Sequence, residues 1–316
     1  MLAKHDLGSR VVVRRFAGFR DDRPQFTDVL GELTGLTDTE LIVSTSQGVV
    51  VVPLAQVHRA KVVPARRGPT AREVAALELA AAEAWPAPVR ELLGDWWLRA
   101  AGGYTGRANS ALPVGDPGLP LPAAVDAVVD FYRAQSLPPQ LDVPLPLASA
   151  VERELLRRGW HAECTVLVQT CPLDELIAAT PDGERFALAD TPSEQFLTMI
   201  AGTLGPLPDA ARHVLTAVPG VVFAQQFDDS GELLARARGS VTGAGRWLGV
   251  FGVETAAAAR RRGLAVAAMG ALARWAAAQG ATDAFLQVNS PNTGAIALYE
   301  RLGFTRHHVY TRYRLR

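Results

Sequence analysis

A short basic segment that contains one glycine is the feature of this sequence that most directly suggests chemistry. Three arginines at 260–262 are followed by Gly263 and by an apolar stretch that predicts a helix over 263–279. Cations at a helix N-terminus oppose the helix macrodipole, so this arrangement is explained if an anion binds between them. Glycine lets the backbone approach closely, and the free N–H groups of the first helical turn can donate to phosphate oxygens. The segment predicts an anion site, and a solvated basic loop before a core helix is the alternative.

A second pair of polar residues lies near the end of the chain. Asn292 and Tyr299 are seven residues apart, nearly two turns, and share one face of a helix expected over 292–302. Leu298 and Leu302 share another face, which is better suited to a core. This spacing presents Tyr299 beside Asn292. Taken alone, Tyr299 is more simply explained as a half-buried aromatic with its hydroxyl at the surface.

The basic segment is not one of the two common nucleotide-binding loops. It has no Gly-x-Gly-x-x-Gly, and the chain has no Gly-Lys-Ser/Thr. It resembles instead the Arg/Gln-x-x-Gly-x-Gly/Ala motif of the GNAT superfamily of acetyl-CoA-dependent N-acetyltransferases, with Arg260, Gly263 and Ala265 at the motif positions. The stretch 287–304 is similar to the superfamily's fifth strand and fourth helix, and the resemblance covers 186–316. It implies acetyl-CoA as co-substrate.

The resemblance also implies a role for each matching residue. The backbone of Val253 and Thr255, at the end of a strand expected over 247–254, would pair with the pantetheine arm. Asn292 would contact the cofactor directly or through water. Tyr299 would donate a proton to the departing thiolate, since a pKa near 10 keeps tyrosine protonated at neutral pH. Backbone groups and arginine side chains of one segment would hold the pyrophosphate: Arg260, Arg261, Arg262, Gly263, Leu264 and Ala265.

The acceptor amine must be neutral to attack a thioester, so the reaction also needs a base or a chain of water molecules. Glu254 lies on the strand beside the expected thioester and is the first candidate, acting through water. It fits equally well an exposed strand carboxylate. His213 is a weaker candidate, in a helix-like segment without a visible partner. No His, Cys, Asp and Glu residues have the spacing of metal ligands, so we expect no metal.

The middle region, 70–178, predicts a degenerate second acetyltransferase-like half, and the alternative is that two helices merely share a common glycine cap. Its Gly159 follows a helix, as Gly303 does, and aligning the two glycines puts Leu155 where Tyr299 stands. The region has no Arg-x-x-Gly-x-Ala segment, so it is expected to have lost both cofactor binding and the proton donor. Its most unusual residues surround a glycine-rich turn and would line an acceptor pocket or else pack in the core: Trp96, Arg99 and Asn109.

Residues 1–63 predict a small all-β domain. Short strands, a hairpin turn at 46–48 and a one-turn helix before the last strand resemble an SH3-like barrel. A basic Pro/Gly linker at 64–69 is the best domain boundary. The catalytic GNAT domain is then expected over 179–316, as an α/β (α+β) mixed sheet with the acyl-CoA N-acyltransferase fold.

Composition narrows the range of partners. The 316 residues balance 32 basic against 32 acidic side chains, which makes nucleic acid an improbable partner for the whole surface. No run reaches the roughly 20 apolar residues that a membrane span needs. The first 16 residues do not have the pattern of a signal peptide. We therefore expect a cytoplasmic protein without a membrane partner.

Three functions remain open on the sequence. The first is an N-acetyltransferase that acetylates a small-molecule amine by direct attack in a ternary complex. The second is a protein acetyltransferase for lysine or N-terminal amines, recruited through the N-terminal domain. The third is an acyl-CoA-binding regulator without activity, against which Tyr299 weighs. The second rests on the basic residues in and after that domain: Arg10, Arg14, Arg15, Arg20, Arg66 and Arg67.

Overall fold

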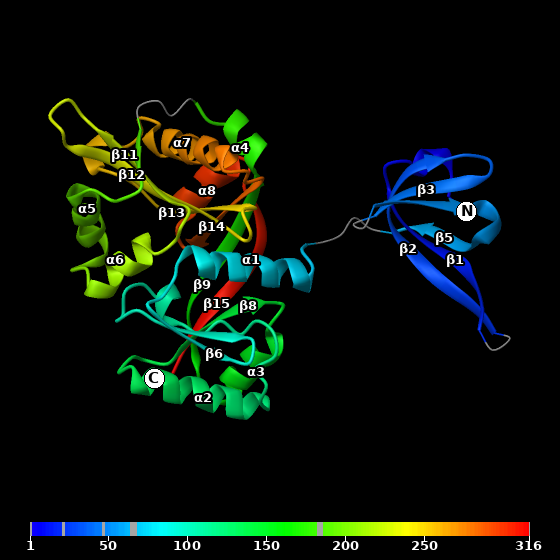
Figure 1. The fold of residues 1–316 in the computed structure, drawn as a ribbon, viewed down its shortest axis with the longest axis horizontal. Helices are drawn as coiled ribbons and strands as arrows, with labels where there is room; N and C mark the ends of the chain where they lie inside the picture. Colours follow the sequence, from blue (N-terminus) through cyan, green and yellow to red (C-terminus); the bar gives the residue numbers. More distant parts are fainter. Residues whose placement is uncertain (1, 21–22, 46–47, 64–67, 182–185, 316) are drawn as a thin grey trace. The chain divides into compact units, whose positions relative to one another are not determined.

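The computed structural model describes residues 2–20, 23–45, 48–63, 68–181 and 186–315, except for the side chain of Arg20. Residues 46–47 of the expected hairpin turn and residues 64–67 of the expected linker, including Arg66 and Arg67, lie outside this set. The chain divides into two compact units, Met1–Gly68 and Pro69–Arg316, drawn in Figure 1. The division falls at the end of the expected linker, and each unit is described by itself.

The first unit is an antiparallel sheet of five strands in the order β4-β3-β2-β1-β5. Alternate residues of its strands form the core, and Val11, Val13 and Leu33 are fully buried. A one-turn helix precedes the last strand, as expected, and the unit is all-β apart from such single turns. Its elements are η1 (Lys4–Asp6), β1 (Arg10–Arg20), β2 (Arg23–Leu36), β3 (Glu40–Thr45), β4 (Gly48–Pro53), η2 (Leu54–Gln56) and β5 (Val57–Val62).

The second unit is built on a mixed sheet of eight strands in the order β10-β11-β12-β13-β14-β9-β15-β8. Only the β13–β14 pair is parallel among the pairs recorded for this sheet. A separate two-stranded hairpin, β6-β7, completes the strands. Their bounds are β6 (Val89–Leu93), β7 (Trp96–Ala100), β8 (Gln140–Leu145), β9 (His161–Pro172), β10 (Ala187–Ala189), β11 (Val221–Phe227), β12 (Leu233–Thr242), β13 (Trp247–Thr255), β14 (Asp283–Asn289) and β15 (Thr305–Arg314).

Helices cover both faces of the large sheet. Along β13 and β14, Leu248, Val250 and Leu286 face α7 and α4, whereas Phe251 and Phe285 face the core shared with α1, α5 and α6. Helices α2 and α3 pack with β7 and β8 in a third core (Figure 1). No helix in the described part of the chain is long and apolar enough to cross a membrane. The helices are α1 (Ala71–Ala84), η3 (Arg107–Asn109), α2 (Leu121–Ala134), α3 (Ser149–Arg157), α4 (Leu173–Ala178), α5 (Glu194–Leu204), α6 (Asp209–Thr216), η4 (Ala257–Ala259), α7 (Leu264–Ala278) and α8 (Thr293–Arg301).

The sheet contains an exchange of strands between the two expected halves of this unit. The middle region ends in β8, α3 and β9, and the C-terminal region ends in the matching series β14, α8 and β15. Each last strand pairs with the other region's series: β9 lies against β14, and β15 lies against β8. The two exchanged strands, β9 and β15, pair with each other between β14 and the edge strand β8. The division expected at 178/179 therefore separates residues that share one continuous sheet.

Two elements differ from the sequence expectation for identifiable reasons. The stretch that forms β8 is rich in proline, and the sequence predicts no strand there. It is the edge strand of the large sheet, where Pro144 needs no partner for the N–H group that it lacks. Helix α5 begins after Ser193, whose hydroxyl accepts a hydrogen bond from the Phe196 N–H at 3.1 Å. The sequence predicts Thr191 as the N-cap and Pro192 as the first helical residue, so the predicted cap lies two positions before the observed one.

Candidate active site

The site begins where two parallel strands separate. β13 and β14 pair from Trp247 with Asp283 to Val250 with Leu286, and the recorded pairing stops there. β13 continues to Thr255 along its other neighbour, β12. A register shift in that pair and the positive φ of Gly252 (59°) turn the strand at this point. The edge of β13 that faces β14 is therefore left without a strand partner beyond Val250 in the described chain.

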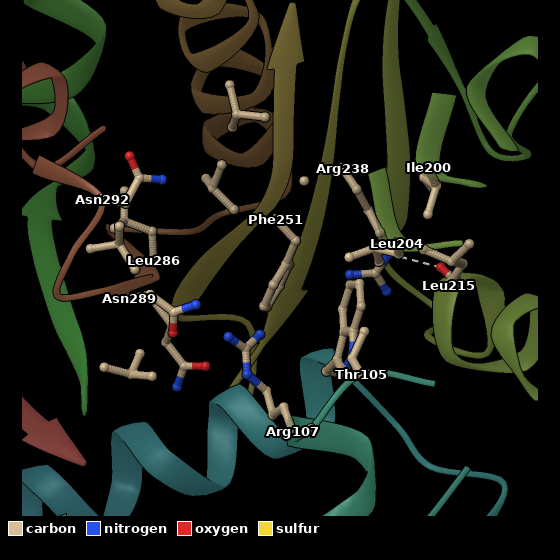
Figure 2. A pocket seen from close by; sticks show the side chains of 18 of the residues that line it. Thr105, Arg107, Ile200, Leu204, Leu215, Arg238, Phe251, Leu286, Asn289 and Asn292 are labelled. Carbon is tan, nitrogen blue, oxygen red and sulfur yellow. Dashed lines mark hydrogen bonds between the residues drawn. The ribbon is translucent and has the colours of Figure 1, made fainter. Parts of the chain in front are cut away.

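A cavity of about 500 Å³ opens at this separation. Its walls come from the ends of β13 and β14, from α5 and α6, from the loop that leads into η3, and from the start of α8. Figure 2 shows Asn292, Asn289 and Leu286 on one side of Phe251 and Arg238 with Leu215 on the other. The cavity thus connects the region expected to hold the cofactor with a second part on the other side of Phe251. We call this part, which Arg238 and Leu215 line, the second compartment.

Asn292 and Tyr299 both line this cavity, as their spacing predicts. Asn292 lies one position before the helix and is its N-cap, because its side-chain oxygen accepts a hydrogen bond from the Ala295 N–H at 3.2 Å. Tyr299 packs at the edge of the core, with its ring centroid 6.0 Å from that of Phe304. Burial raises the pKa of the Tyr299 hydroxyl, which keeps it protonated at neutral pH.

The basic segment forms the turn that opens α7. Arg261 and Gly263 both have positive φ, 61° and 77°, and Gly263 is the N-cap. This left-handed conformation explains the glycine. The cap has no side-chain hydrogen bond among the described residues, so the N–H groups of the first turn, including Leu264 and Ala265, point out of the helix end uncapped by a side chain. Arg260 and Arg262 are exposed beside them. The segment lies outside the cavity wall.

Glu254 and the backbone expected to bind pantetheine lie on the freed end of β13. Val253 lines the cavity, whereas Thr255 and Glu254 do not. The Glu254 carboxylate is an ion pair with the Arg236 guanidinium and also accepts a hydrogen bond from the Thr203 hydroxyl at 2.7 Å. Arg236 donates a further hydrogen bond to the Gly252 carbonyl at 3.0 Å. Glu254 is thus held by a cation, unlike a solvated strand carboxylate.

The structure corrects the expectation for Trp96, Arg99 and Asn109, none of which lines the cavity. Trp96 is buried in the core under α2 and α3. The Arg99 Nε–H donates to the Ser110 carbonyl at 2.8 Å, and its guanidinium lies 3.7 Å from the Asp142 carboxylate. Trp96 and Arg99 point to opposite faces of β7, and both side chains are buried. Alternation along a strand does not show which buried face holds a cavity.

Asn109 does not line the cavity, but its side chain holds the turn whose residues do. Its side-chain oxygen accepts from the N–H groups of Ala101 and Gly103, and its amide donates to the carbonyls of Tyr104 and Thr105. These four bonds fold the glycine-rich turn. The residues that the turn presents to the cavity are Tyr104, Thr105, Gly106 and Arg107.

Several cavity residues were not expected from the sequence. Trp85, Phe251 and the arginines Arg107 and Arg238 line the second compartment, together with Arg236 from the same strand as Arg238. The available signal was the pair of arginines two positions apart in the otherwise apolar strand 233–242, which puts both on one face. His213, the weaker base candidate, lies on α6 and does not line the cavity. No group of three or more His, Cys, Asp or Glu in the described chain could hold a metal ion.

Comparisons with known proteins agree with this geometry. A family model described as "Probable histone acetyltransferase Rv0428c C-terminal" matches residues 70–314. The chain is 31% identical to the "Probable histone acetyltransferase Rv0428c" of Mycobacterium tuberculosis over 98% of its own length and 95% of that protein. It is 26% identical to the "Uncharacterized N-acetyltransferase YobR" of Bacillus subtilis, over 74% of this chain and 95% of that one.

Solved structures show the same fold. A GCN5-related N-acetyltransferase from Kribbella flavida superposes with a TM-score of 0.56 at 19% identity, covering 79% of this chain and 96% of that one. A tandem GNAT protein from the clavulanic acid biosynthesis pathway gives a TM-score of 0.51 at 16% identity, covering 79% and 89%. Named acetyltransferase relatives and this fold set aside a regulator without activity. The chain is an acetyltransferase that belongs to the Rv0428c C-terminal family, within the GNAT superfamily.

Proposed function

We propose that this enzyme transfers the acetyl group of acetyl-CoA to the amine of a small molecule by direct attack in a ternary complex. One observation carries the proposal: the separation of β13 from β14 opens into the same cavity that Tyr299 and Asn292 line. A free strand edge can pair with the pantetheine amides, and a protonated hydroxyl at the same place can serve the thiolate that leaves.

In this proposal the chain binds acetyl-CoA along two neighbouring elements. The backbone of Val253 and Thr255 pairs with the pantetheine arm, because no described strand pairs with this edge on the β14 side. The uncapped first turn of α7, from Gly263 to Ala265, donates N–H groups to the pyrophosphate. The exposed side chains of Arg260, Arg261 and Arg262 add positive charge. Asn292 contacts the cofactor from the start of α8.

The transfer step then needs two proton movements. The amine nitrogen attacks the thioester carbonyl, a C–N bond forms and the C–S bond breaks. Tyr299 gives its hydroxyl proton to the departing thiolate, and its raised pKa keeps the hydroxyl protonated at neutral pH. The amine releases its proton to water or, through water, to Glu254. For Glu254 to act as this base, its carboxylate must do so while paired with Arg236.

The direct test is calorimetric titration of the full chain with acetyl-CoA, followed by release of free thiol with a panel of small amines and lysine peptides. Saturable binding with amine-dependent thiol release supports the proposal. An absence of acetyl-CoA binding would contradict it at the cofactor step. Release with peptides alone would contradict the small-molecule acceptor.

A substitution at Gly263 tests the proposed pyrophosphate site. We expect Gly263→Asp to weaken acetyl-CoA binding by at least about tenfold, since it sets a carboxylate beside phosphate charges. Folding should be preserved, because a Cβ at this position meets nothing within 4 Å and aspartate tolerates positive φ better than most residues. Gly263→Asn is the matched control, with the same shape and no charge. Equal affinity of the two variants for acetyl-CoA, measured by calorimetry, would place the pyrophosphate elsewhere.

A protein acceptor is the second candidate, and one comparison favours it. The Mycobacterium tuberculosis relative is named a probable histone acetyltransferase and matches nearly the whole chain, including the first unit. Recruitment by that unit predicts that deleting residues 1–68 lowers acetylation of a protein acceptor. Our proposal predicts instead that the deletion leaves acetyl-CoA affinity and small-amine turnover within about twofold, since the cavity lies wholly within Pro69–Arg316. Comparing both acceptors with the full and shortened chains separates the two.

A further inference from the structure

The second compartment of the cavity holds a buried guanidinium with unused donors. Arg238, on β12, is 1% exposed. Its Nε–H donates to the Leu215 carbonyl at 2.8 Å, whereas neither terminal nitrogen has a hydrogen-bond partner in the described chain. The rings of Trp85 and Phe251 lie 5.0 and 5.4 Å from its Cζ. The two rings pack against each other with centroids 4.9 Å apart, so Arg238 presents up to four N–H donors beside this aromatic pair.

Arg107 approaches the same aromatic pair from the opposite wall. Its Cζ lies 5.2 Å from the Phe251 ring and 5.9 Å from the Trp85 ring, and its buried Nε has no hydrogen-bond partner among the described residues. In Figure 2 its guanidinium reaches up from the turn toward Phe251, while Arg238 lies on the far side of Phe251 from Asn292. Two cations thus face one apolar compartment.

No described acidic residue balances the charge of Arg107 and Arg238. The other two arginines of the cavity wall have acidic partners: Arg236 pairs with Glu254, and Arg312 pairs with Asp142 at 2.7 Å. Arg107 and Arg238 have no ion pair recorded within the described chain, and no aspartate or glutamate lines the cavity there. Burial lowers the pKa of Arg238 to about 9, and nearby Arg107 adds to this lowering. An anionic ligand would offset the desolvation cost of the buried guanidinium by accepting hydrogen bonds from its unpartnered N–H groups.

We propose that the acceptor is a small amine that also carries a carboxylate and an apolar body, and that Arg238 and Arg107 bind this carboxylate. This inference rests on the proposed function and names its substrate class. Trp85, Phe251, Ile200 and the neighbouring apolar side chains enclose the body of the acceptor. The carboxylate lies at the arginines, and the amine points past Phe251 to the separation of the strands. Two positive charges at this place also disfavour a lysine-rich peptide, which would bring more positive charge.

The test uses the full chain saturated with acetyl-CoA and pairs of acceptors that differ only in charge. Suitable pairs are L-phenylalanine with L-phenylalaninamide, L-leucine with L-leucinamide, and 4-(aminomethyl)benzoate with 4-(aminomethyl)benzamide. We expect the acid of at least one pair to bind, and its kcat/KM to exceed that of the amide by at least about tenfold. Arg238→Met should abolish this preference by lowering kcat/KM for the acid alone. Acetyl-CoA affinity should not change.

One further variant and one further measurement serve as controls. Arg133→Met removes an exposed arginine outside the cavity and should leave the preference intact. Arg238→Met should not lower the melting temperature, because methionine fills a similar apolar volume without the desolvation cost of a charge. The proposal is overturned if no acid has a higher kcat/KM than its amide. It is also overturned if the preference for the acid persists in Arg238→Met. Failure of the proposed function is a different result, the loss of acetyl-CoA binding itself.

Discussion

Replacing Tyr299 by phenylalanine is expected to lower kcat by about 10²-fold or more while leaving the acetyl-CoA dissociation constant unchanged. General-acid catalysis by a positioned group contributes about 10²–10⁴-fold to a rate, and phenylalanine removes the proton without changing the ring. The ring itself packs at the core edge beside Phe304, so the fold should be preserved. Steady-state kinetics by thiol release, with calorimetry for acetyl-CoA, measure the two quantities separately.

A second tyrosine of the same cavity supplies the control. Tyr310 is buried in the cavity wall, and burial raises its pKa to about 12. It also remains protonated at neutral pH, but it is not on the helix that carries Asn292. Tyr310→Phe should change kcat by less than about threefold, within the range of an ordinary buried hydroxyl. A large loss of kcat in Tyr310→Phe and none in Tyr299→Phe would show that Tyr299 is not the proton donor.

The pKa of Tyr299 also fixes the direction of the pH dependence. An acid with a raised pKa stays protonated up to a higher pH than an ordinary tyrosine, whose pKa is about 10. The alkaline fall in kcat that is caused by losing this proton should therefore begin only above about pH 10. Measuring kcat up to that pH in the wild type and in Tyr299→Phe checks this. A fall near pH 7 that disappears in Tyr299→Phe would contradict the role.

Asp142→Asn is expected to destabilise the second unit by about 3–5 kcal/mol, the usual cost of removing one partner from a buried ion pair. The Asp142 carboxylate is 2% exposed and accepts two hydrogen bonds from Arg312, at 2.7 and 2.9 Å, and one from the Ser110 hydroxyl at 2.8 Å. Arg99 lies 3.7 Å away. The substitution leaves two buried cations without their anion. At this chain length the melting temperature should fall by roughly 10 °C.

An exposed ion pair of the same unit is the matched control. Asp126 pairs with Arg158 at 2.5 Å, but its side chain is 67% exposed, so solvent screens the interaction. Asp126→Asn should therefore change the melting temperature little. Calorimetric unfolding of both variants gives the comparison. Similar shifts for the two would mean that the Asp142 cluster does not stabilise the unit by charge.

The local parts of the candidate site were accessible from the sequence. The helix expected over 263–279 is α7, Leu264–Ala278, because its start and end are set by glycines and by composition within a few residues. The presentation of Tyr299 beside Asn292 depends on spacing along one helix, and both residues line the cavity. These predictions needed no knowledge of which segments meet.

The second compartment of the cavity was not predictable from the sequence, because it is made by contacts between distant segments. Trp85 ends α1, Arg107 lies in η3 and Arg238 lies on β12, and only tertiary packing brings them together. Trp96 and Arg99 illustrate the converse error, in which core residues are predicted to line a cavity. Their strand is buried on more than one face, and the pattern of side chains does not distinguish a packed core from a cavity wall.

The exchange of β9 and β15 gives the middle region a structural role that cannot be read from its sequence motifs. β9 is the neighbour of β14 along its whole length, and the Thr165 carbonyl accepts a hydrogen bond from the Ser290 N–H at 2.9 Å, just before Asn292. The arrangement is that of a swapped dimer whose two subunits have been joined into one polypeptide. The middle region therefore has a structural role, since the C-terminal region takes from it the strand that lies beside β14 in the sheet.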